Sequence, residues 1–241
     1  MEELLYELSS ESRLSILREL NKKNCNMTGV ANKLDLTTTE ASRQLQRLSD
    51  ALLAQKQPDG TYSITNYGRL VLHLSSPLEF VFKHREYFIT HDIWGLPDQF
   101  LSRLGELSGS NLNMDSLENI NTTERMTREA REYIWMGGFE QPLNINQILA
   151  ELVPKGVKCR SLFLESFIPK VPLAPEVARG TEWRRIDTFP VSLLTTENWG
   201  GIAFPFNDGR ADYAGFVGTD PIFLNWARDL FLYYWEKGKR I

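Results

Sequence analysis

The sequence has little cysteine and little histidine. Its two cysteines, Cys25 and Cys159, lie in different parts of the chain and are too few for a disulfide framework, so we expect reduced thiols. Cys159 falls in a predicted buried strand, which argues against a redox sensor. The three histidines never stand at zinc-binding spacings from the cysteines. We therefore expect no metal site and no cofactor.

The sequence also lacks long hydrophobic runs and the short motifs of common enzymes. No stretch approaches the roughly 20 apolar residues that a membrane-spanning helix needs. The acidic start, MEELLYELSSESR, has no apolar core of the kind that signal peptides carry. Neither a GxSxG motif nor a phosphate-binding glycine loop is present. These absences predict a cytoplasmic protein that has no membrane partner and is not an enzyme.

The charge is unevenly distributed. The 241 residues carry a net charge of −4, yet residues 12–75 hold nine Lys and Arg against five Asp and Glu, a local charge of +4 that leaves −8 for the rest. A basic module on an acidic body is typical of a regulator that contacts DNA with one end only.

The pattern of residues 27–65 predicts a winged helix-turn-helix. A short amphipathic helix is followed by a turn at 35–37 and by a longer helix over 38–52. Thr37-Thr38-Thr39-Glu40 fits the capping box that starts such a helix. Two short extended runs, 54–57 and 61–64, flank Pro58-Asp59-Gly60, which is a strong hairpin signal and would form the wing.

The helix predicted over 38–52 has an apolar stripe and a polar side. The polar side carries the residue types that reach phosphates and base edges in the major groove. The wing and the start of the next helix add two basic residues in positions suited to phosphate. The predicted DNA contacts are Thr38, Thr39, Ser42, Arg43, Gln46, Arg47, Lys56 and Arg69.

The rest of the chain predicts a linker and a second domain. Ser75-Ser76-Pro77 predicts a break, because the residue before proline disfavours helical geometry. The predicted domains are 1–76 for DNA binding, 77–109 as a helical linker and candidate dimerisation segment, and 110–241 for regulation. A dimer through the first helix or through the C-terminal domain is an open alternative. Alternating helices and strands after residue 110 predict a largely parallel sheet covered by helices. The fold class is therefore α/β (α+β overall).

Three stretches carry a resemblance to a known family. They are GFEQP with LAELVPKGVKCRSLF, then FPVSLLTTENWGGIAFPFNDGRADYAGFVGTD, and finally FLNWARDLFLYYWEKGKRI. Together with the winged helix, they resemble the archaeal methanogenesis-regulator (FilR-type) family of transcription factors, and the resemblance covers nearly the whole chain. It implies an ArsR-like N-terminal domain, a homodimer, and a C-terminal sensor domain.

The resemblance also implies that the sensor domain is similar to the phospholipase D-like domains of archaeal sugar-responsive regulators. Enzymes of that fold use His-x-Lys followed by a downstream Asp. The histidines here read His73-Leu74-Ser75, His84-Arg85-Glu86 and His91-Asp92-Ile93, so the motif is absent.

A ligand pocket is the expected site in the second domain, because loops after the carboxyl ends of strands gather small molecules in such sheets. Each candidate residue also has a structural explanation, such as a buried Trp, a turn Asp or a surface Arg. The predicted ligand-binding residues are Trp135, Phe139, Glu140, Arg160, Asp187, Trp199 and Asp212.

The leading hypothesis is a homodimeric DNA-binding transcription regulator that binds operator DNA through 38–52 and 54–64 and responds to a small-molecule effector. One alternative is a protein-interaction adaptor that keeps the winged helix without reading DNA. Another is a phospholipase D-like enzyme, which the missing His-x-Lys argues against.

Overall fold

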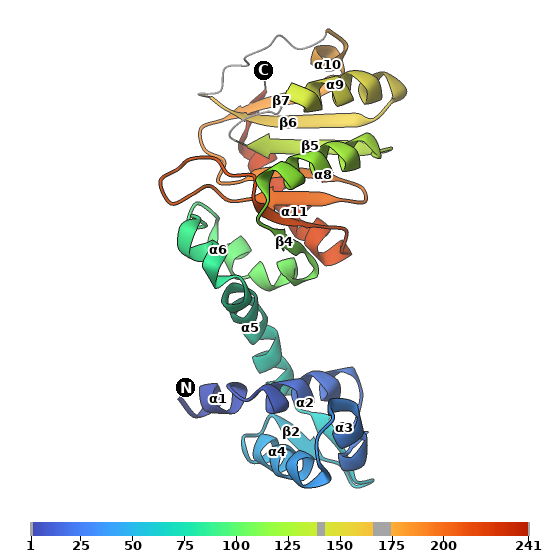
Figure 1. The fold of residues 1–241 in the computed structure, drawn as a ribbon, viewed down its shortest axis with the longest axis vertical. Coiled ribbons are helices and arrows are strands. Elements are labelled where there is room, and N and C mark those ends of the chain that lie inside the picture. Colours follow the sequence, from blue (N-terminus) through green and yellow to red (C-terminus); the bar gives the residue numbers. More distant parts are fainter. Residues whose placement is uncertain (1, 139–142, 166–174, 241) are drawn as a thin grey trace. The chain divides into compact units, whose positions relative to one another are not determined.

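The computed structural model describes residues 2–138, 143–165 and 175–240. The chain divides into two compact units, Met1–Ser76 and Pro77–Ile241. Helices and two β-sheets occur together, so the predicted fold class, α/β (α+β overall), is confirmed (Figure 1). No helix among the described residues is both long and apolar enough to cross a membrane.

The first unit consists of short helices and a small antiparallel sheet with strand order β1-β3-β2. Its elements are α1 (Glu2–Leu8), α2 (Glu11–Lys22), β1 (Cys25–Asn26), α3 (Met27–Leu34), α4 (Thr38–Asp50), β2 (Ala54–Lys56) and β3 (Thr61–Ile64). The predicted order of helix, turn, helix and hairpin is present. Strand β1, which pairs with β3, is additional.

The helices of this unit bury one stripe each. On α4 the buried residues include Ala41, Leu45 and Leu48, which recur at helical spacing and pack with Val30 of α3 and Leu17 of α2. Because these side chains have no access to water, the rotation of α4 about its own axis is fixed. The polar side of α4 must therefore face outward.

Local capping determines where α4 begins. The chain leaves α3 through Asp35, which adopts a left-handed conformation with φ 53°. Thr37 then accepts a hydrogen bond at Oγ1 from the backbone N–H of Glu40, at 3.1 Å. This bond satisfies one of the four N–H groups that a helix start leaves free.

Helix α5 (Asn66–Lys83) passes through Pro77, so the predicted break at 75–77 is wrong. Thr65 caps this helix by accepting from the N–H of Gly68 at 2.9 Å. Proline lacks the N–H that would bond to the carbonyl of residue 73. His73 is exposed, so water can reach that turn.

The second unit is built on an eight-stranded sheet of order β11-β7-β6-β5-β8-β9-β10-β4. Its strands are β4 (Asn111–Asn113), β5 (Tyr133–Gly138), β6 (Lys158–Leu164), β7 (Thr181–Ile186), β8 (Ser192–Thr196), β9 (Gly200–Ala203), β10 (Gly215–Gly218) and β11 (Lys239–Arg240). Its helices are α6 (Arg85–Thr90), α7 (Asp98–Leu101), the 3-10 turns η1 (Leu104–Gly109) and η2 (Val153–Lys155), α8 (Ser116–Arg128), α9 (Leu143–Leu152), α10 (Pro175–Gly180) and α11 (Pro221–Lys237).

The sheet is mixed, which corrects the prediction of a largely parallel one. Among the described strands, only β5, β6 and β7 pair in parallel, whereas β8, β9, β10, β4 and β11 pair antiparallel. The reason lies in the connections. Short turns join β8 to β9 and carry no crossover helix, so those strands must run in opposite directions.

The two faces of the sheet are covered differently. Helix α11 packs on one face with fully buried Phe223, Trp226 and Phe231, while α8 and α9 cover the other (Figure 1). The segment 77–109 contributes Phe80, Tyr87 and other buried side chains to the α11-side core. It is thus part of this unit's core and not a separate linker.

Replacing the capping threonine should destabilise the first unit. We expect Thr37→Ala to lower its free energy of unfolding by about 1 kcal/mol, because the N–H of Glu40 loses its partner. Thr38→Ala, one residue later at an exposed position, is the matched control and should change stability by less than about 0.5 kcal/mol. Equal effects of both variants on thermal unfolding would contradict the capping role.

Candidate nucleic-acid interface and ligand site

The polar side of α4 lies at the surface of the first unit. Thr38, Thr39, Ser42, Arg43 and Gln46 are all exposed. Their exposure follows from the burial of Ala41, Leu45 and Leu48 on the opposite side. The first turns of α4 thus present hydroxyl, guanidinium and amide groups together.

Two arginines four residues apart on α4 have different environments. Among the described residues, Arg43 has no ion-pair partner. Arg47 Nη2, by contrast, lies 2.5 Å from Glu7 Oε1, and its guanidinium covers the ring of Tyr6. Arg47 therefore holds α1 against α4, and Arg43 is the more accessible cation. Gln46 is also engaged, because its Nε2 donates to Asp50 Oδ1 at 2.8 Å.

Glu7 joins three helices through two arginines. It is buried, and its carboxylate contacts Arg47 of α4 and Arg13 of α2, the latter at 2.9 Å. Arg13 also donates to Gln44 Oε1 of α4. The hydrogen bond from Arg47, helped by the charges of both arginines, outweighs burial and lowers the pKa of Glu7. No sequence pattern predicted this cluster, because residues about 40 positions apart leave no local signal of their pairing.

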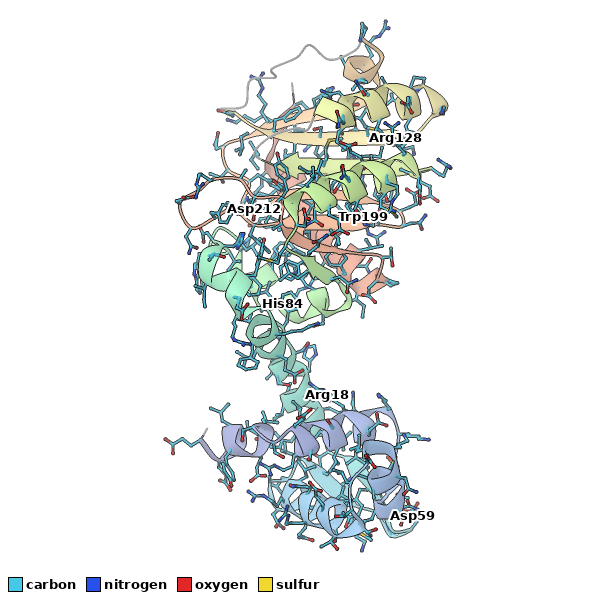
Figure 2. The ribbon with its side chains drawn as sticks, in the orientation of Figure 1. Arg18, Asp59, His84, Arg128, Trp199 and Asp212 are labelled. Carbon is cyan, nitrogen blue, oxygen red and sulfur yellow. The ribbon has the colours of Figure 1, made fainter. Side chains whose placement is uncertain are left out.

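The two remaining predicted contacts are basic and exposed. Lys56 lies on β2 opposite Tyr62 of β3, and Arg69 lies in the first turn of α5. The hairpin tip between these strands is held by Asp59, which accepts from the N–H and hydroxyl of Thr61 (Figure 2). These hydrogen bonds lower the pKa of Asp59.

The predicted ligand residues do not gather in one place. Trp135 and Arg160 lie on the α11 face, where the Arg160 guanidinium packs 5.4 Å from the Trp135 ring centre and 5.3 Å from that of Trp235. Trp199 is buried in the core on the α8 face. Asp187 is exposed after β7. Phe139 and Glu140 lie outside the described residues.

Asp212 has a structural role (Figure 2). Its Oδ2 lies 3.0 Å from His91 Nε2, and its Oδ1 accepts from Ser116 Oγ at 2.9 Å. Burial raises the pKa of Asp212, but hydrogen bonds from His91, the N–H of Ala214 and Ser116 outweigh that effect and lower it. The carboxylate thus ties the segment before β10 to the end of α6 and the start of α8.

A hollow in this unit lies between the sheet and α8. It has a volume of about 100 Å³ and is lined by residues of α8, α9, β5, β6, β8, β9 and β10. Among the described candidates, none of Trp135, Arg160, Asp187, Trp199 and Asp212 lines it. These five residues therefore do not belong to this hollow, and their part in ligand binding stays a prediction. The predicted residues are large or charged, whereas this hollow lies where glycine, serine and alanine line the strands.

Cys159 is buried on β6 beneath α9. Burial raises the pKa of its thiol to about 12, so the reactive thiolate is strongly disfavoured. This environment agrees with the expectation that Cys159 is not a redox sensor.

Comparisons with known proteins give no family assignment. No family model matches the chain, and no curated protein is significantly similar to it. One similar solved structure is described as that of TrmBL2, an archaeal chromatin protein with a novel mode of DNA binding; it is 15% identical, with 90% of this chain and 88% of that chain covered and a TM-score of 0.46. A likeness to an archaeal DNA-binding protein is thus found, but the FilR-type family is not shown. At this TM-score the likeness carries no argument about function.

Two other similar structures are enzymes. CalO1, a methyltransferase of calicheamicin biosynthesis in its SAH-bound form, is 13% identical with a TM-score of 0.27; 77% of this chain and 62% of that chain are covered. RosA, a dimethyltransferase from Streptomyces davawensis, is 12% identical with a TM-score of 0.29. The match covers 77% of this chain and 64% of that chain. These neighbours contradict the expectation that the chain is not an enzyme, and we withdraw it. Their TM-scores assign no reaction in its place.

Neutralising Glu7 should loosen α1 from α4. We expect Glu7→Gln to lower the free energy of unfolding of the first unit by about 1–3 kcal/mol at neutral pH, because two arginines lose a charged acceptor. Glu11→Gln, an exposed position on α2, is the matched control.

The stability lost in Glu7→Gln should become smaller as the pH falls. Since folding lowers the pKa of Glu7 below its ordinary 4.5, its contribution is present above that value and is lost as the pH falls through the lowered folded pKa. The difference between wild type and Glu7→Gln in chemical denaturation should therefore shrink below pH 4.5. A difference that stays constant down to pH 2 would contradict this role.

Proposed function

We propose that the chain is a DNA-binding transcription regulator, with residues 1–76 as a winged helix-turn-helix domain. The observation that carries the proposal is the exposed side of α4, where Thr38, Thr39, Ser42 and Arg43 stand in the first turns of a helix held rigidly from behind. A recognition helix contacts base edges with residues near its N-terminus. The positive end of the helix dipole favours nearby phosphate as well.

The hairpin and α5 extend the proposed contact. In a winged helix the hairpin after the recognition helix lies along the DNA backbone, and Lys56 on β2 is exposed there. Arg69, in the first turn of α5, would add a phosphate contact. Arg47 is the weakest of the predicted contacts, because its charge is already paired with Glu7.

We further propose that the regulator is a homodimer formed through α5. Exposed apolar side chains recur along this helix at intervals of three or four residues, namely Tyr67, Leu70, Leu74, Leu78 and Phe82. Such spacing is that of a helix seam, in which the side chains of one copy fit between those of another. A dimer also suits operators whose half-sites lie about 34 Å apart.

The remaining part of the proposal is a response to a small ligand in the second unit. The hollow beneath α8 supports it, because small-molecule sites are concave and mainly apolar. Ligand binding would act by favouring one arrangement of the two recognition helices over another.

The first test is Arg43→Ala in a DNA-binding titration. We expect operator affinity to fall about 5- to 150-fold, equivalent to the 1–3 kcal/mol of a good base contact, with the free energy of unfolding unchanged. Arg18→Ala makes the same change at an exposed position on α2 and should leave affinity within about twofold. If both variants bind like wild type, α4 does not read DNA and the proposal fails. The operator fragment is first selected from random duplexes with the wild-type protein.

The second test addresses the dimer. Leu74→Glu places a carboxylate in the α5 seam of each copy, so we expect the dimer dissociation constant to rise at least about tenfold in sedimentation analysis. His73→Glu changes the neighbouring exposed residue and should leave association unchanged. A wild-type protein that sediments as a monomer at 100 μM or so would contradict the homodimer, whatever the variants do.

A further inference from the structure

The hollow beneath α8 owes its shape to a row of small residues across four strands. Gly138 of β5, Ser192 of β8, Ala203 of β9 and Gly215 of β10 lie side by side on the α8 face. A Cβ atom at Gly138 would lie 3.0 Å from Ser192 Oγ, and one at Gly215 would lie 2.9 Å from Ala203 Cβ. These neighbours therefore leave little room for a side chain at Gly138 or Gly215, and the row forms the floor of a trough.

The walls of the trough are apolar. Ile120 of α8, Ile145 of α9, Met136 of β5, Leu194 of β8 and Val217 of β10 line it. Among the described lining residues, Glu124 is the single charged one, and no Lys or Arg is present. Anions such as phosphates or carboxylates would find no counter-charge here. A sugar would leave most of its hydroxyl groups facing hydrocarbon.

Two buried polar atoms mark the trough as a binding site. Ser161 of β6 is fully buried and Asn119 of α8 is 4% exposed, and both line the hollow. Within the described part of the chain, Ser161 Oγ and Asn119 Oδ1 have no hydrogen-bond partner. Asn119 uses its Nδ2 group on the carbonyls of Asn113 and Tyr213, which orients the amide and leaves Oδ1 as an acceptor. Such atoms are rarely left unpaired in a native interior.

Size and shape limit the ligand further. The volume is about 100 Å³, somewhat smaller than an apolar cavity of about 150 Å³ that accommodates benzene. The trough crosses from β6 to β10, four strand spacings or about 19 Å, so it is narrow for its length. A thin, unbranched chain fits these dimensions better than a bulky ring system.

We propose that this trough binds a small, uncharged, unbranched aliphatic molecule with one terminal hydroxyl group, which pairs with Ser161. This proposal specifies the ligand for the response proposed above. It rests on that proposed function only where ligand binding is linked to DNA binding. The hydrocarbon part would lie along Gly138, Ser192 and Ala203 beneath α8.

The test uses the full-length protein with methyl-labelled methionine and hexan-1-ol as the probe. Met136 lines the trough, so its methyl resonance should shift in a saturable way at millimolar hexan-1-ol. Hexanoate and glucose at the same concentrations should shift it far less. A Met136 signal that does not respond to hexan-1-ol up to about 20 mM, or that responds more to hexanoate or glucose, would overturn the proposal.

Two variants fill the trough from opposite sides. Ala203→Leu acts from the sheet, and Thr123→Phe acts from the half-exposed side of α8, where folding should tolerate it. Both should abolish the response. Ala178→Leu, an exposed position on α10, should preserve it. Hexan-1-ol binding that persists in a folded Ala203→Leu or Thr123→Phe protein would place the molecule elsewhere and overturn the assignment.

The hydroxyl contact and the link to DNA are tested separately. Ser161→Ala should weaken hexan-1-ol binding about 2- to 10-fold, the worth of one neutral hydrogen bond, and unchanged binding would overturn the pairing with Ser161. Operator affinity is then measured with and without hexan-1-ol. If the probe binds at Met136 and DNA affinity does not change, the trough assignment holds and the sensing part of the proposed function fails.

Discussion

The packing of α11 against one face of the eight-stranded sheet is the constraint on which the second unit depends. Side chains alternate between the two faces of a strand, so residues that fill one face cannot fill the other. Phe223, Trp226 and Phe231 are fully buried on the α11 face, each contributing about 1.5–3 kcal/mol by leaving water. Side chains of α11 cover that face. The opposite face has Gly, Ser and Ala where its strands meet α8, and a hollow is left there.

The first unit shows how one helix positions a neighbour's side chains. Arg43 and Arg47 are the same residue type on α4, and spacing along the helix gives them similar directions. Glu7 distinguishes them, because it brings a buried carboxylate to Arg47 and leaves Arg43 at the surface. Removing either Glu7 or Arg47 alone would leave the charge of the other unpaired beside a packed core, which lowers the free energy of unfolding. Helix α1 thus determines which of the two arginines is engaged in an ion pair.

Local signals predicted much of the chain correctly. Thr37 caps α4, and Asp59 and Gly60 form the hairpin tip, because each feature depends on atoms only a few residues apart. The break expected at Pro77 did not occur, since Phe80 and Val71 anchor α5 on either side and the lost bond lies at an exposed turn. The prediction of a largely parallel sheet was wrong, because the alternation of helices and strands ends before β8. Trp135 and Arg160 were chosen by chemical type, which does not indicate the face of a strand.

The sequence by itself determined the fold class, the capped helix α4 with its polar side, and the hairpin after it, since helical period and turn chemistry act over short distances. Tertiary structure alone decided the pairing of Glu7 with Arg47, the strand order of the sheet, and the trough beneath α8. These features join residues tens of positions apart, and their energies come from burial and close approach. No pattern along the chain records which distant side chains will share a face.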